Sequence, residues 1–96
     1  MKLLTDEIRR SLPPLYSTED QGDAAIVRVK FFTPTSSWTW YAIEFDGDDL
    51  FFGLVDGFEK EMGYFSLSEL ESVVGPYGVG VERDLYFKPC LLAEVR

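Results

Sequence analysis

Arg83 stands between two acids, Glu82 and Asp84, with Tyr77 and Tyr86 close by in the chain. A guanidinium group presents a planar fork of N–H donors that matches a carboxylate or a phosphate, and paired carboxylates can serve acid–base chemistry. These five residues therefore form a candidate ligand site. The competing interpretation is structural: the two acids anchor Arg83, which then pins the C-terminal loop.

Other reactive residue types are scarce. The chain has no histidine and one cysteine, Cys90. This composition excludes Ser-His-Asp and Cys-His nucleophile arrangements as well as cysteine-rich zinc sites. Cys90 follows Pro89 in an apolar tail, so we expect it to pack as a small hydrophobic residue. We identify no catalytic residue, no metal site and no cofactor.

Two glycine-containing segments resemble ligand loops only superficially. The "DGDD" segment, residues 46–49, is much shorter than an EF-hand loop and lacks its closing glutamate, so we expect a hairpin turn. The "GPYGVG" segment, residues 75–80, lacks the lysine of a P-loop and does not follow a clear strand. Both are interpreted as structural turns.

The chain is strongly acidic, with 17 acidic and 9 basic residues and a net charge of −8. Such a chain has no basic excess to displace the counterions of nucleic acid, so we expect no direct nucleic-acid binding. The charge serves either solubility or the attraction of a basic protein partner. The residues predicted to bind that partner are Trp38 and Trp40 as apolar anchors, with Asp46, Asp48, Asp49, Asp56, Glu59 and Glu61 around the hairpin turns.

The elements that must position these residues follow from periodicity and capping. Thr5 can cap a helix over Leu3–Leu12, and Ser66 with Glu69 fits a capping box that starts a second helix ending at Gly75 as a left-handed cap. The intervening strands are predicted at 25–33, 38–45, 50–55 and 62–65, with a last one at 85–87. The sequence predicts a single α+β domain, 1–96: an antiparallel meander of about four to five strands with two short helices packed on one face.

The register of the central hairpin predicts which side chains face the core. A four-residue loop at 46–49 places Phe45 opposite Leu50 and Tyr41 opposite Leu54, with Ile43 opposite Phe52. That face is apolar throughout, and we expect the helices to cover it. In the same way Val27, Val29 and Phe31 are expected to point to one face of their strand.

The other face of the hairpin carries Trp38, Trp40 and Glu44. Two interpretations remain open for its aromatic residues. They are core if the C-terminal third of the chain covers them, and they mark an interaction surface if it does not.

The compartment follows from what the chain lacks. No apolar run is long enough to span a membrane, and the N-terminus does not have the pattern of a signal peptide. A lone cysteine cannot form an internal disulfide, so we expect a cytoplasmic protein with no membrane association. The oligomeric state is left open.

Five segments occur together in a recognisable order: "SLPPLY", "VKFFTP", "SWTWYAIEFD", "LFFGLVDGFEKEMGYFSLSEL" and "ERDLYFKP". In this combination the chain resembles the bacterial domain-of-unknown-function family 2958, from Leu3 to about Glu94. The resemblance implies a single-domain protein of the kind common on plasmids, phages and integrative elements. It carries over no catalytic residue.

Three hypotheses of function follow. The leading one is a non-enzymatic acidic interaction module from a mobile element, which inhibits a host nucleic-acid-targeting defence (an anti-CRISPR or anti-restriction role) by binding a basic protein surface. The alternative is a small-ligand-binding domain or weak enzyme with an anion site near Arg83. The third is a structural subunit of a larger assembly.

Overall fold

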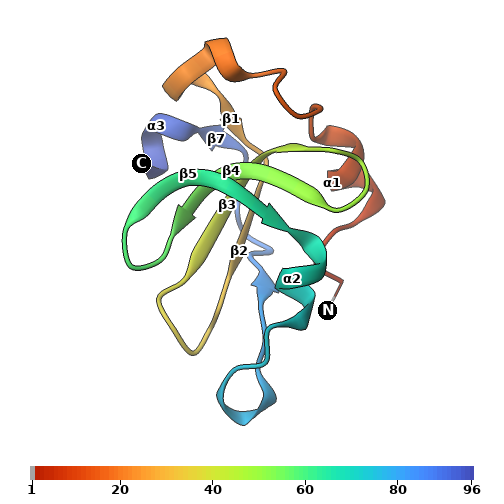
Figure 1. The fold of residues 1–96 in the computed structure, drawn as a ribbon, viewed down its shortest axis with the longest axis vertical. Helices are drawn as coiled ribbons and strands as arrows, with labels where there is room; N and C mark the ends of the chain where they lie inside the picture. Colours follow the sequence, from red (N-terminus) through yellow and green to blue (C-terminus); the bar gives the residue numbers. More distant parts are fainter. Residues whose placement is uncertain (1) are drawn as a thin grey trace.

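A five-stranded antiparallel sheet with strand order β5-β4-β3-β2-β6 organises residues 2–96, the part of the chain that the computed structural model describes (Figure 1). A second, two-stranded sheet pairs β1 with β7. The predicted α+β meander with two short helices on one face is confirmed. The strands are β1 (Ile26–Val27), β2 (Val29–Phe32), β3 (Thr39–Phe45), β4 (Leu50–Asp56), β5 (Lys60–Ser66), β6 (Glu82–Arg83) and β7 (Cys90–Leu91); the helices are α1 (Asp6–Ser11), α2 (Leu67–Ser72) and α3 (Leu92–Val95), with 3-10 turns η1 (Glu19–Ala24) and η2 (Pro76–Gly78).

Both predicted helix caps are present. Thr5 Oγ1 accepts a hydrogen bond from Ile8 N at 3.2 Å, and Ser66 Oγ accepts one from Glu69 N at 3.1 Å. The expected left-handed cap at Gly75 is wrong, because α2 already ends at Ser72 and Gly75 has a φ of −90°. The left-handed residues of this loop are instead Tyr77 and Gly78.

The central hairpin contains a β-bulge that the predicted register lacks. Tyr41 lies opposite Leu54 as predicted, but Phe45 faces Phe51 instead of Leu50 because one extra residue, Ile43, is inserted between Ala42 and Glu44. A bulge reverses the side-chain phase of a strand. Phe45 therefore joins the cluster around Phe51, whereas Ile43 stays in the cluster around Leu54.

A second phase break occurs at Arg28, between β1 and β2. Val29 and Phe31 are buried in one cluster and Val27 in the other, so the expectation that all three share a face is wrong. The Arg28 N–H donates to Ala42 O at 2.9 Å, which puts this break beside the β3 bulge. The predicted single strand at 25–33 is thus two strands in two sheets.

Both faces of the large sheet are covered in part, each by a different part of the chain. Helices α1 and α2 pack on the Ala42–Phe51 face, not on the Tyr41–Ile43 face that the register had assigned to them. The C-terminal segment returns along the opposite face, where Leu92 belongs to the buried cluster of Ile43 and Leu54, and Phe87 packs against that cluster. No strand forms at the predicted 85–87, since the pairing residues are 82–83 and 90–91 and the chain between them crosses from one sheet to the other.

Candidate protein-interaction surface

Trp38 is the centre of a partly exposed aromatic group at the end of β3. Its ring stacks on Trp40, with centroids 6.0 Å apart, and meets Phe58 edge to face at 5.4 Å. Both tryptophans are half-buried, while Phe58 in the β4–β5 turn is 94% exposed. A side chain at Gly57 would overlap the Trp38 ring, so the ring lies directly on the backbone of that turn.

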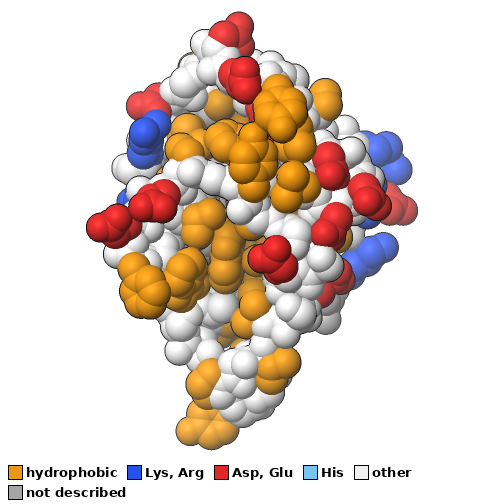
Figure 2. Space-filling model, in the orientation of Figure 1, with side chains coloured by type: hydrophobic (Ala, Val, Ile, Leu, Met, Phe, Trp, Pro, Cys, Tyr) orange, Lys and Arg blue, Asp and Glu red, His pale blue; other side chains and the backbone are white. Residues whose placement is uncertain are grey.

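Two hollows lie on either side of Trp38. The first, of about 310 Å³, is lined by Val55, Phe58, Glu59 and Glu61 as well as Trp38. The second, of about 360 Å³, runs between the two tryptophans and the loop after α2. Figure 2 shows the corresponding face, where apolar side chains gather around a depression with acidic side chains beside them. We call the following set the Trp38 surface: Trp38, Trp40, Val55, Phe58, Glu59, Glu61, Val73, Pro76 and Val79.

Only two of the predicted acids join the tryptophans. Glu61 lies opposite Val55, which lies opposite Trp40, so one cross-strand row carries all three. Glu59 lines the same hollow. Asp56 pairs with Thr39 instead, and strand alternation places it on the opposite face of the sheet.

The acids of the 46–49 turn are at the far end of β4. Seven strand residues span about 20 Å, so this turn and the Trp38 surface are separate places on the protein. Two of its acids have structural partners. Asp46 Oδ1 accepts from the N–H groups of Asp48, Asp49 and Leu50 at 2.8 to 3.0 Å, which lowers the pKa of Asp46, and Asp49 accepts from the backbone N and the Oγ of Ser68, each at 2.8 Å.

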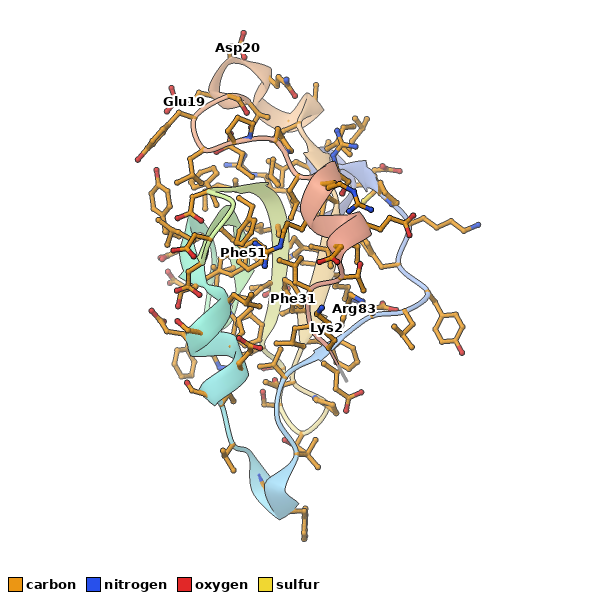
Figure 3. The ribbon with its side chains drawn as sticks, turned by 90° about the vertical axis from the view of Figure 1, so that its right-hand side faces the viewer. Lys2, Glu19, Asp20, Phe31, Phe51 and Arg83 are labelled. Carbon is orange, nitrogen blue, oxygen red and sulfur yellow. The ribbon has the colours of Figure 1, made fainter. Side chains whose placement is uncertain are left out.

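The predicted ligand site around Arg83 is not assembled as expected. Tyr77 and Tyr86 are 99% and 92% exposed, and neither lines the hollow beside Arg83. The Arg83 guanidinium donates to the carbonyl oxygens of Lys2 at 2.5 Å and Leu3 at 2.9 Å, so it fastens the N-terminal segment to β6 (Figure 3).

The two acids beside Arg83 point to different neighbours. Glu82, in β6, lies opposite Phe32 of β2. Asp84 forms an ion pair with Lys30 at 3.6 Å and accepts the Tyr86 N–H at 2.9 Å. The structural interpretation of Arg83 is correct in that its side chain fastens another segment of the chain. That segment is the N-terminal one and not the C-terminal loop.

Sequence reasoning missed two important residues. No role is predicted for Phe58 from the sequence, although a large aromatic residue in a polar turn is itself a signal of an exposed interaction site. Glu44 was expected on the face of Trp38 and Trp40, but the bulge turns it to the other face. There it is buried, and its carboxylate accepts hydrogen bonds from Tyr16 and Thr18. A lone acid inside an apolar strand was the available signal for that role.

Comparison with known protein families gives one match. A family model described as "Protein of unknown function (DUF2958)" matches residues 3–93. The chain belongs to this family. DUF2958 carries no assigned activity in that description, so the function has to be argued from the geometry. No curated protein and no solved structure gave a match. Within residues 2–96, no helix is both long enough and apolar enough to cross a membrane.

Proposed function

We propose that this DUF2958 protein is a non-enzymatic interaction module that binds a basic protein through the Trp38 surface. The observation that carries the proposal is the stacked Trp38–Trp40 pair, open to solvent on the side of Phe58 and bordered by Glu59 and Glu61. Aromatic residues at the centre of a patch and charges at its margin are the usual anatomy of a protein interface.

Charge complementarity selects the kind of partner. The net charge of −8 repels acidic proteins and nucleic acid at long range, and it attracts a basic surface. The two glutamates beside the hollow direct that attraction to the aromatic residues. The expected partner therefore offers an apolar side chain flanked by lysine or arginine.

Proteins that hold DNA or RNA have basic surfaces of this kind. A small acidic domain can occupy such a surface and block it. Inhibition of a host nucleic-acid-targeting defence, in an anti-CRISPR or anti-restriction role, is accordingly the specific activity that we propose. Support comes from the charge, from the aromatic anchors and from the resemblance to proteins of mobile elements.

Binding is tested with matched charge variants. The protein is immobilised, partners are captured from a bacterial lysate, and each candidate is purified and its affinity measured at several salt concentrations. Trp38→Ala should weaken binding by at least about tenfold, the loss typical of an interface hot spot. Glu59→Gln with Glu61→Gln should weaken binding and flatten its salt dependence. Asp48→Asn with Glu71→Gln removes the same charge elsewhere and should have little effect.

Equal loss of affinity in both double variants would mean that net charge alone drives binding. Unchanged affinity of Trp38→Ala would exclude the Trp38 surface as the binding site.

The defence role has its own readout, the efficiency of plasmid transformation into cells with an active CRISPR or restriction system. Expression of the wild-type protein should raise this efficiency and expression of Trp38→Ala should not. If the protein binds a specific basic partner but does not raise transformation efficiency, the interaction function stands and the defence role is excluded.

A further inference from the structure

Arg28 is a cation without an acceptor in the part of the chain that is described. Its side-chain Nε is shielded from solvent and has no hydrogen-bond partner within residues 2–96. No ion pair of its guanidinium group is found there either. Buried donors in folded proteins are nearly always paired, so this one is an exception. The Arg28 side chain as a whole is half-buried, so its terminal N–H groups are the ones that a bound molecule would reach.

The fold makes a hollow at this position. The C-terminal chain pairs with β2 through Glu82–Arg83 and with β1 through Cys90–Leu91. After a last backbone bond from Asp84 N to Lys30 O at 2.9 Å, residues 85–89 leave the sheet edge. A hollow of about 450 Å³ lies between this crossing segment and α1, with Arg28 among its lining residues. The view of Figure 3 faces this side, with α1 and the crossing segment both toward the viewer.

The lining combines two guanidinium groups and two carboxylates, those of Glu7 and Asp84, with apolar surface. Ile8 from α1 and Phe87 and Pro89 from the crossing segment supply apolar walls, and Arg83 adds a second positive charge beside Arg28. Arg83 is already engaged with the carbonyl oxygens of Lys2 and Leu3, so its contribution is its charge.

The acids near the hollow do not neutralise Arg28. Asp84 is held by Lys30 and by the Tyr86 N–H. Glu7 is an exposed residue of α1 that also lines the hollow, and within residues 2–96 it forms no ion pair with Arg28. The chemistry that fits is an oxyanion, because a guanidinium fork binds a carboxylate or phosphate with two parallel hydrogen bonds.

We propose that this hollow binds a small organic anion, a carboxylate or a phosphate monoester with a short apolar body, whose head group pairs with Arg28. The apolar body packs against Ile8 and Phe87. The site shares no residue with the Trp38 surface, so the proposal is independent of the interaction function.

The experiment titrates the full chain with sodium hexanoate and with phenyl phosphate, each against sodium chloride at the same ionic strength. Methyl signals of Ile8 and Val29 report occupancy by NMR. Both probes, or one of them, should shift these signals saturably, whereas chloride should not. A response to a single head group supports the site and assigns its ligand class.

Variants connect the response to Arg28. Arg28→Gln should raise the dissociation constant by at least about tenfold, since the charged fork is lost. Arg28→Lys keeps the charge without the fork, so it should show an intermediate loss and covers the case in which Arg28→Gln folds poorly. Arg10→Gln, an exposed change on α1 beside the hollow, should stay within about twofold of the wild type.

Glu7→Gln tests whether the carboxylate in the lining of the hollow weakens the binding of an anion. Removal of this carboxylate should tighten probe binding, since it takes away a like charge near the head group. The proposal is overturned if neither probe shifts the Ile8 and Val29 signals, if chloride shifts them equally, or if Arg28→Gln binds the probes as the wild type does.

Discussion

Glu44 holds the segment after α1 onto the sheet, and its replacement by glutamine should loosen that segment. The side chain is 2% exposed. One carboxylate oxygen accepts the Tyr16 N–H at 2.9 Å, and the other accepts the Thr18 N–H at 2.9 Å together with the Thr18 hydroxyl. Tyr16 has a φ of 70°, an unusual conformation for a residue with a side chain, so this segment depends on its tertiary contacts.

The cost of Glu44→Gln follows from these three contacts. An amide has a single acceptor oxygen, so in either orientation its NH₂ group faces one backbone N–H and leaves that donor without an acceptor. An unsatisfied buried donor costs about 1–3 kcal/mol, and the remaining bonds lose the strength that the charge gave them. The neutral glutamine no longer carries the desolvation cost of a buried carboxylate, and this gain opposes the losses. Because three donors already compensate the carboxylate, we expect a net loss of about 2 kcal/mol.

Two measurements check this value. The melting temperature should fall by about 8–16 °C, as expected for a domain of this size. Amide hydrogen exchange at Tyr16 and Thr18 should accelerate by at least about tenfold, and more than exchange at β4. The matched control is Glu71→Gln, an exposed acid on α2, which should leave both quantities nearly unchanged. A melting temperature of Glu44→Gln within about 2 °C of the wild type would refute the reasoning.

Three further changes have definite outcomes. Gly53→Ala adds a methyl group that would overlap the Tyr41 carbonyl oxygen, so urea unfolding should show a loss of about 3 kcal/mol, whereas Gly63→Ala, which meets no atom within 4 Å, should be tolerated far better. The Asp46 carboxylate, whose folded-state pKa is lowered by backbone N–H groups, stabilises the fold above its ordinary pKa of 3.8; the wild type should therefore be more stable than Asp46→Asn near neutral pH, and a difference that does not shrink as the pH falls below about 4 would contradict this role. Burial, followed by a neighbouring carboxylate, raises the pKa of the Cys90 thiol, so a disulfide reagent near pH 8 should modify it at least about tenfold more slowly than in urea, and equal rates would contradict its packing.

Features that depend on neighbours in the chain could be predicted from the sequence. The caps at Thr5 and Ser66 need only a hydroxyl at the right distance from an N–H group three residues later, and the structure contains both. The hairpin turn at 46–49 is equally local, because Asp46 supplies its own acceptor to the turn. The α+β class follows from the order of such local elements.

Features that depend on distant segments could not be predicted. The bulge at Ile43 and the break at Arg28 are adjacent in space but lie on different strands, and each reverses the side-chain phase. Simple alternation therefore assigned Phe45 and Val27 to the wrong faces. Gly53 was the available clue, since a glycine inside a strand often marks a bulge or a close backbone approach.

The residues of the candidate site also fall into two groups, those that the sequence could identify and those whose role only the fold determines. Trp38 and Trp40 stand out in the sequence, and Glu61 shares their face by alternation. Asp46 and Asp49 have the same charge but are bonded to N–H groups of their own turn and of α2. Composition cannot separate an acid that caps a backbone from an acid that faces a partner, because that difference is made by the fold.

The lengths of the elements explain why the Trp38 surface is open. Helix α2 has six residues and is about 9 Å long, whereas β4 spans about 20 Å across the same face. The helices can therefore cover only the part of the sheet near Phe51. The loop after Ser72 borders the two tryptophans across a hollow and leaves them half-buried. The part of a sheet that nothing covers ordinarily carries polar residues. This chain places two tryptophans there, adds Phe58 in the adjacent turn, and flanks them with glutamates, an arrangement that stability alone does not require and that a protein partner would explain.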